Sequence, residues 1–148
     1  RAEWATQPSG LVVAYTSSRS VPATLARELL TRLMVARRID FGLMMQAAET
    51  YPMNVAEGAG ERVRWYQAAA ALRPRNTAAL NRLGITLLDI GDVDGAIAAF
   101  REAIHIDPEY VNLHHNLGNA LRAKGQTDGA IAAYREAIRR DPKYASPH

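Results

Sequence analysis

The leucines of residues 77–90 are spaced as one face of an amphipathic helix (Leu80, Leu83, Leu87 and Leu88). Gly91 follows this face and is typical of a residue that ends a helix in the left-handed conformation. A second helix is expected after a cap at Asp92 or Asp94. It should stop before Pro108, because the residue preceding a proline disfavours helical geometry. The pattern therefore predicts two antiparallel helices joined by a short loop.

The same pattern returns one period later along the chain. Residues 77–110 and 111–144 are identical at 17 of 34 positions, and Pro74, Pro108 and Pro142 stand one period apart. Half of the positions being identical is too many for chance, so we predict two successive helix pairs, 75–110 and 111–144. Pairs of this kind bury their apolar faces by stacking on one another.

Glycines in the middle of the first helix of each pair indicate close helix crossings. Gly84 and Gly118 occupy equivalent positions, where glycine costs about 1 kcal/mol relative to alanine. That cost is understandable if a neighbouring helix passes at this point. Phe100 and Tyr134, one period apart, are expected to fill the space between successive pairs.

A weaker copy of the pattern precedes these two pairs. Residues 59–74 align with the second helix of a pair, although Arg62 replaces the alanine found at Ala96. We interpret residues 40–74 as a degenerate pair, with a first helix that ends near Tyr51 and a loop at 54–60.

The sequence patterns at the two ends of the chain give less specific predictions of structure. An amphipathic helix is expected within 22–39, opened by a proline and carrying Leu25, Leu29, Leu30, Leu33 and Met34. Residues 1–21 read as a linker or irregular arm, with a possible short strand at 11–15. Residues 145–148 resemble the start of a further, truncated repeat, so we expect this sequence to be a piece of a longer protein.

Composition narrows the classes of partner. The 18 basic and 15 acidic residues are interleaved, and a net charge of +3 favours a solvated helical surface over a nucleic-acid-binding one. No run approaches the ~20 apolar residues of a membrane-spanning helix. There is no cysteine, so the chain has no disulfide bonds that would require an oxidising compartment. A cytoplasmic location is therefore expected.

No catalytic, metal or cofactor site is expected. His114 and His115 are adjacent on a helix and point about 100° apart, so they cannot share a metal ion. The segment Asp92–Gly95 looks like part of a calcium loop, but Ile90 and Arg101 occupy its first and last ligand positions. No paired nucleophile and base stands out, so we do not expect an enzyme.

The repeat period, with Leu-Gly early, Ala-x-x-x-Phe/Tyr in the middle and proline at the end, resembles the tetratricopeptide repeat (TPR). The resemblance implies an all-α fold, a right-handed superhelical solenoid of antiparallel helix pairs, here with an irregular N-terminal arm. The segment 114–121 is similar to repeats of O-linked N-acetylglucosamine transferases. Segments 66–74 and 95–104 are similar to the C-terminal repeats of planctomycete-type serine/threonine protein kinases, although no kinase motif is present.

The resemblance also implies that the first helices line a concave groove that binds a peptide or protein segment. Asn116 matches the position whose asparagine holds peptide backbone in the transferase family, whereas Arg82 replaces it one repeat earlier. Carried over residue by residue, the groove positions are Asn81, Arg82, Ile85, Asp89, Asn112, His115, Asn116, Asn119 and Arg122.

An alternative function is structural. Ile131, Tyr134 and Ile138 lie on a face of the last helix that a following helix would cover. If nothing covers it, this face is expected to mediate self-association. The chain would then be a self-assembly or spacer module of a larger enzyme, such as a bacterial serine/threonine kinase or glycosyltransferase.

Overall fold

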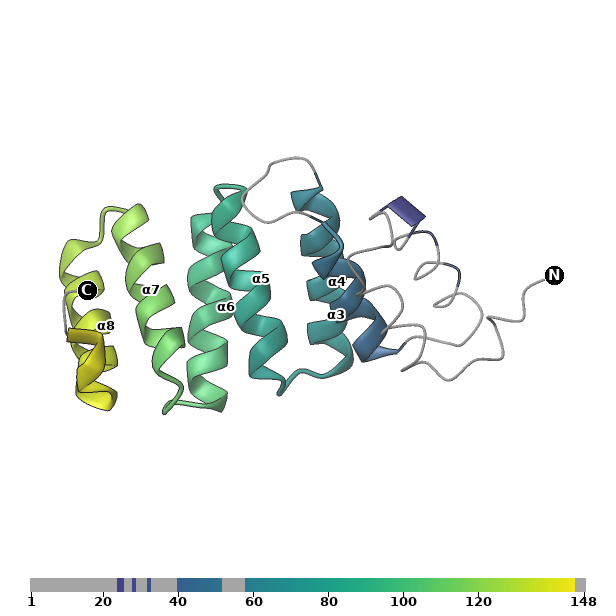
Figure 1. Ribbon diagram of the computed structural model, residues 1–148. Coiled ribbons are helices and arrows are strands. Elements are labelled where there is room, and N and C mark those ends of the chain that lie inside the picture. Colours follow the sequence, from purple (N-terminus) through teal and green to yellow (C-terminus); the bar gives the residue numbers. More distant parts are fainter. Residues whose placement is uncertain (1–23, 26–27, 29–31, 33–39, 52–57, 146–148) are drawn as a thin grey trace. The chain divides into compact units, whose positions relative to one another are not determined.

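The computed structural model describes residues 24–25, 28, 32, 40–51 and 58–145 (Figure 1). The described residues form two compact units, divided between Leu72 and Arg73, which we describe separately. All of the regular elements in the described part are helices: α3 (Phe41–Glu49), α4 (Ala59–Leu72), α5 (Thr77–Asp89), α6 (Val93–Ile106), α7 (Val111–Ala123), α8 (Thr127–Arg140) and the 3-10 turn η2 (Pro142–Ala145).

The second unit is a row of four helices packed in chain order. α5 pairs with α6, α7 pairs with α8, and α7 also packs on α6 (Figure 1). The interior is formed by the apolar residues that recur at helical spacing, including Leu80, Leu83, Leu87, Ile97, Phe100, Leu113 and Leu121. This arrangement follows from the pattern, since each helix has one apolar face and buries it only against its neighbours.

The loops within the pairs are built as the sequence predicts. Gly91 and Gly125 have φ angles of 81° and 78°, in the left-handed region that favours glycine. After the first of these turns, the Asp92 carboxylate accepts a hydrogen bond from the Gly95 amide at 3.0 Å, which makes Asp92 the cap of α6. At the equivalent position α8 has Gln126, whose side chain makes no cap hydrogen bond.

The two mid-helix glycines mark the closest approach within each pair. A Cβ atom on Gly84 would lie 2.6 Å from a ring carbon of Phe100, and one on Gly118 would lie 2.5 Å from a ring carbon of Tyr134. The repeat pattern predicted that these rings fill the space between successive pairs. In the structure each ring also lies against the glycine of its own pair, because the missing side chain leaves space for the ring.

The first unit contains one described pair, α3 and α4, which pack against each other. Asp40 caps α3 by accepting a hydrogen bond from the Leu43 amide at 3.1 Å. The loop predicted at 54–60 ends at Gly58 rather than at Gly60, because α4 already begins at Ala59. Arg62, which departs from the repeat pattern, is fully buried.

Several predictions fall outside the described residues: the arm at 1–21, most of the helix at 22–39, the loop at 52–57 and the chain at 146–148. Of the segment 22–39, the described residues are Thr24, Leu25, Glu28 and Arg32, and each is helical. In the part of the chain that the structure describes, no helix has the length and apolar character needed to cross a membrane.

The glycine–ring contact gives a direct test of the packing. We expect Gly118→Ala to lower the free energy of unfolding by about 1–2 kcal/mol, because overpacking against Tyr134 outweighs the better helix propensity of alanine. Gly129→Ala, in the same pair, is the matched control: its Cβ would meet the Leu121 side chain at an ordinary 3.4 Å. Urea unfolding followed by circular dichroism compares the two. Equal stabilisation by both substitutions would contradict the close crossing.

Candidate functional site

The candidate binding surface consists of the residues predicted to line the groove, all on α5 and α7. We call it the first-helix surface. Five of its side chains are half-buried: Asn81, Ile85, His115, Asn116 and Asn119. Four are exposed: Arg82, Asp89, Asn112 and Arg122. The surface therefore combines partly enclosed amide groups with charged groups that reach into solvent.

Two amides from successive first helices are joined. The side-chain Nδ2 of Asn116 on α7 donates a hydrogen bond to Oδ1 of Asn81 on α5, over 2.9 Å. Each asparagine amide carries two N–H donors and an oxygen with two lone pairs, so this bond uses only part of their capacity. Asn81 keeps its amide donors and Asn116 keeps its carbonyl oxygen. The pair can thus offer both kinds of hydrogen-bonding group to a ligand.

A second contact ties the first-helix surface to α8. The Tyr134 hydroxyl donates a hydrogen bond to Oδ1 of Asn119 at 2.7 Å. The Tyr134 ring also contacts the His115 ring, with centroids 5.6 Å apart and planes tilted by 51°. Tyr134 therefore orients two residues of the first-helix surface, although it belongs to the second helix of the pair.

The sequence pattern predicted packing and self-association for Tyr134 but not this polar role. A signal was present in the repeat: Phe100 and Ile85 are both apolar, whereas their equivalents Tyr134 and Asn119 are both polar. The two positions change together from one pair to the next. A paired change of this kind is what a hydrogen bond between the two positions requires.

His114 has a structural role in the turn before α7. Its side chain is 6% exposed, and its Nε2 lies 2.7 Å from the carbonyl oxygen of Pro108, to which it donates a hydrogen bond. This contact fastens the turn before α7 to the helix itself. Among the residues that the structure describes, no cluster of three potential metal ligands is found.

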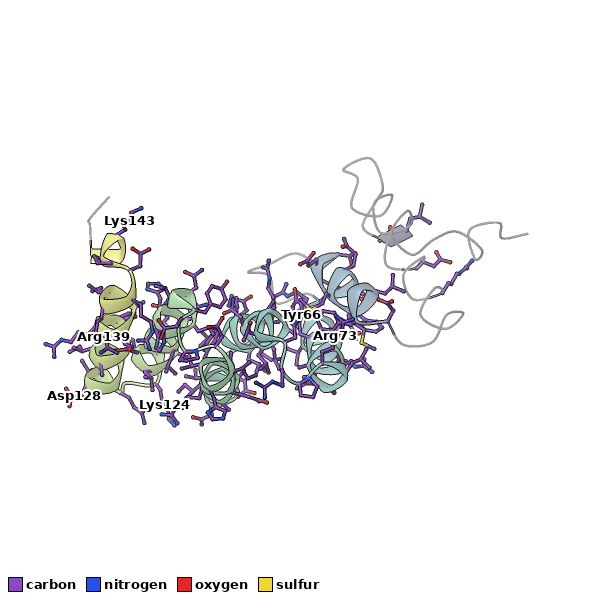
Figure 2. All side chains as sticks on the ribbon, turned by 90° about the horizontal axis from the view of Figure 1, so that it is seen from below. Tyr66, Arg73, Lys124, Asp128, Arg139 and Lys143 are labelled. Atoms are coloured by element: carbon purple, nitrogen blue, oxygen red, sulfur yellow. The ribbon has the colours of Figure 1, made fainter. Side chains whose placement is uncertain are left out.

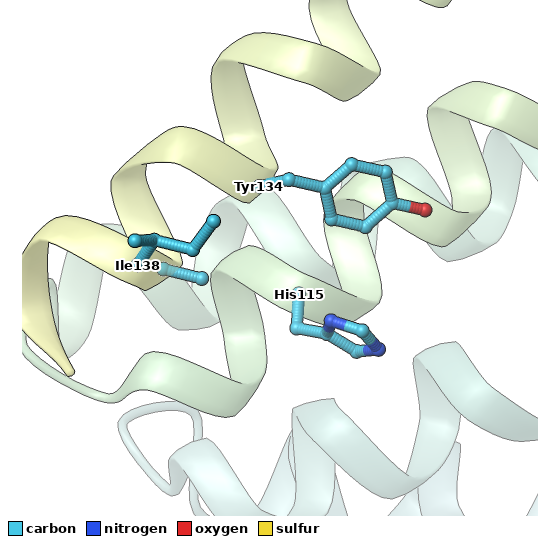
Figure 3. A pocket seen from close by; sticks show the side chains of 4 residues that line it. His115, Tyr134 and Ile138 are labelled. Atoms are coloured by element: carbon cyan, nitrogen blue, oxygen red, sulfur yellow. The ribbon is translucent and has the colours of Figure 1, made fainter. Parts of the chain in front are cut away.

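A small pocket of about 190 Å³ opens between α7 and α8. His115 lines it from α7, and Tyr134, Ala137 and Ile138 line it from α8. In Figure 3 the side chains of Tyr134, Ile138 and His115 surround the same space. The pocket is thus bordered on one side by a residue of the first-helix surface and on the other by the face predicted to self-associate.

Comparison with known proteins supports the fold. Residues 86–121 and 118–148 match the family model for the TPR repeat. Among solved structures, the chain is similar to a crystal structure of MamA, with a TM-score of 0.75 and 24% identity over 83% of this chain and 71% of that one. A structure of MamA AMB-1 gives a TM-score of 0.76 and 22% identity, covering 90% of this chain and 76% of the other.

MamA from Desulfovibrio magneticus RS-1 (residues 41 to the end) gives a TM-score of 0.73 and 17% identity, over 84% of this chain and 69% of that one. No curated protein sequence matches. The predicted all-α solenoid of TPR helix pairs is therefore confirmed for the described residues. At these identities the MamA structures inform the fold alone. The resemblance to transferase and kinase repeats stays a prediction.

The hydrogen bond between Tyr134 and Asn119 can be measured by a double-mutant cycle. We expect Tyr134→Phe to lower the free energy of unfolding by about 0.5–1.5 kcal/mol, since it leaves Asn119 without the hydroxyl donor but keeps the ring. In the Asn119→Ala background the same substitution should cost much less. Urea denaturation of the four proteins gives the coupling energy, and a value near zero would show that the bond does not form in solution.

Proposed function

We propose that the first-helix surface binds an extended segment of a protein partner. The observation that carries this proposal is the joined pair of amides, Asn81 and Asn116, at the centre of the surface. The support from comparison is general: repeats of this type are interaction modules. The peptide ligand and the concave groove remain our inference.

The chemistry of the surface suits a peptide main chain. An extended peptide presents N–H and C=O groups alternately, and it needs donors and acceptors held at fixed places. The amides of Asn81 and Asn116 hold one another in place, so less side-chain freedom is lost when a ligand binds. The exposed charges of Arg82, Asp89 and Arg122 lie on the same helices and can select among side chains of the ligand.

Binding of a protein segment in this way requires no catalytic step, cofactor, nucleic acid or membrane. The cytoplasmic location remains a prediction from the sequence. We also propose that the parent protein is a kinase or a glycosyltransferase, which the sequence upstream or downstream of this chain would test.

A peptide-display screen against the folded chain tests the proposal. We expect peptides with micromolar or tighter affinity whose binding falls about tenfold with Asn116→Ala, the order of effect for one or two lost hydrogen bonds at a partly buried site. Arg135→Ala, an exposed substitution on α8 outside the first-helix surface, is the control and should leave affinity unchanged. Binders that are indifferent to both substitutions would place the binding site elsewhere.

Self-association is a second candidate function, favoured by a specific observation. Ile131 and Ile138 on α8 are 42% and 38% exposed, which is unusual for large apolar residues that share one helix face. Together with Tyr134 they form the face that the sequence analysis assigned to self-association. A chain that assembles through this face would act as a structural or spacer element.

Sedimentation distinguishes the two candidates. If the α8 face self-associates, the mass at tens of micromolar should exceed the 16.2 kDa of the monomer, and Ile138→Lys should reduce it. Because Ile138 is partly exposed, the substitution should leave the fold intact, which circular dichroism can verify. A monomeric chain at that concentration would remove self-association from consideration and leave peptide binding unaffected.

A further inference from the structure

The distance between Tyr134 and Asn119 shows which end of the asparagine amide faces the hydroxyl. Oη of Tyr134 and Oδ1 of Asn119 lie 2.7 Å apart, the usual length of an O–H···O bond and shorter than is usual when an amide nitrogen donates. The carbonyl end of the amide therefore faces Tyr134, and its Nδ2 end is turned away. No second partner of this amide is found in the described part of the chain.

The Tyr134 ring is held in place without help from its hydroxyl. The helices α7 and α8 pack side by side, with their side chains filling the space between them (Figure 2). A Cβ atom on Gly118 would lie 2.5 Å from a ring carbon of Tyr134, and the His115 ring lies beside it, with 5.6 Å between the centroids (Figure 3). Because the ring is fixed, the hydroxyl holds the Asn119 side chain in one orientation.

The preceding helix pair shows that packing alone does not require these two polar groups. There the equivalent residues are Phe100 and Ile85, and Phe100 lies against the mid-helix glycine of its own pair in the same way. An apolar pair therefore serves the same helix crossing. Tyr134 and Asn119 add a hydroxyl and an amide that the crossing does not need, which points to a role outside the packing of the pair.

A neighbouring amide is oriented in the opposite sense. Asn116 lies three residues before Asn119 on α7, so the two side chains are neighbours on one face of the helix. The Nδ2 group of Asn116 donates to Asn81, which leaves its carbonyl oxygen as an acceptor. α7 therefore presents an acceptor from Asn116 next to a donor from Asn119.

We propose that Asn116 and Asn119 together bind the main chain of one residue of an extended partner segment, and that Tyr134 is the positioning residue for this contact. The Nδ2 group of Asn119 donates to the C=O of that residue, and Oδ1 of Asn116 accepts from its N–H. Both groups of one residue point to the same side of an extended chain, as they do in the hydrogen-bonded pairs of an antiparallel sheet. This contact rests on the proposed function and adds a requirement: the partner residue cannot be proline, which has no N–H.

The orientation of the Asn119 amide can be tested without a ligand, on the complete 148-residue chain. Tyr134→Phe removes the hydroxyl and keeps the ring. We expect the NMR signal of the Asn119 Cγ carbon to shift, because its carbonyl loses a hydrogen bond, while the Nδ2 signal changes little. A shift of Nδ2 with Cγ unchanged would mean that the nitrogen faces Tyr134, and it would overturn the proposed contact.

Two capped peptides test the main-chain contact by NMR titration. The probe is pentaalanine, which offers main-chain groups and no polar side chain. The matched control is pentaproline, which is also extended but has no N–H group. We expect pentaalanine to shift the side-chain amide signals of Asn116 and Asn119 saturably. Pentaproline should bind at least about fivefold more weakly, as for the loss of one hydrogen bond.

Substitutions separate the donor from the packing. Asn119→Asp keeps an acceptor for Tyr134 but has no donor, so pentaalanine should bind about fivefold more weakly. Asn119→Ile combined with Tyr134→Phe reproduces the apolar pair of the preceding repeat, so this variant should fold and lose the same affinity. Tyr134→Phe alone should weaken binding about twofold, because the amide is present but must be ordered on binding. Arg135→Ala, an exposed substitution on α8, should leave binding unchanged.

Several results would overturn the contact. Pentaalanine binds Asn119→Asp or the double variant as tightly as the wild-type chain, or pentaproline binds as tightly as pentaalanine. Unchanged affinity in Tyr134→Phe would remove the positioning role. If Asn116→Ala alone weakens pentaalanine, the proposed function stands and the role of Asn119 falls. If pentaalanine does not bind at all, main-chain recognition by these two amides is overturned, whereas the proposed function is still decided by the peptide-display screen.

Discussion

The close contact between a glycine and an aromatic ring within each helix pair is the constraint on which the second unit depends. Gly84 lies against Phe100 and Gly118 against Tyr134, at distances that leave no room for a side chain on the glycine. The contact brings the two helices of a pair close together, and the alanines of the second helix are buried with it, as Ala130, Ala133 and Ala137 are on α8. The larger Ile131 of α8 is exposed, whereas the equivalent Ile97 of α6 is buried.

The last helix pair exposes two chemically different surfaces in the described part of the chain. The first-helix surface carries the amides that α5 and α7 contribute together. The second surface is the face of α8 that carries Ile131, Tyr134 and Ile138. Tyr134 belongs to both, since its ring borders the pocket while its hydroxyl holds Asn119. One helix pair therefore presents two different surfaces, one along its first helix and one on its second helix.

The sequence predicted the helices of the second unit well, because period, glycines and prolines are local signals. It left the cap of α6 open between Asp92 and Asp94, and the structure selects Asp92. It did not predict the contacts of Asn116 with Asn81 or of Lys124 with Asp94, since these depend on how successive helices lie against one another. The buried Arg62 was recognised as a departure from the repeat, but nothing in the local pattern indicated that it would lie in the interior.

We infer that each second helix is stabilised by the first helix of the next pair, which packs on it. Native-state hydrogen exchange measures this directly, because amide protection reports the free energy of local opening. The equivalent amides of Phe100 and Tyr134 give the comparison, one on the covered helix α6 and one on the open helix α8. We predict slower amide exchange throughout α6 than throughout α8. Equal protection of the two helices in the free protein would contradict the claim.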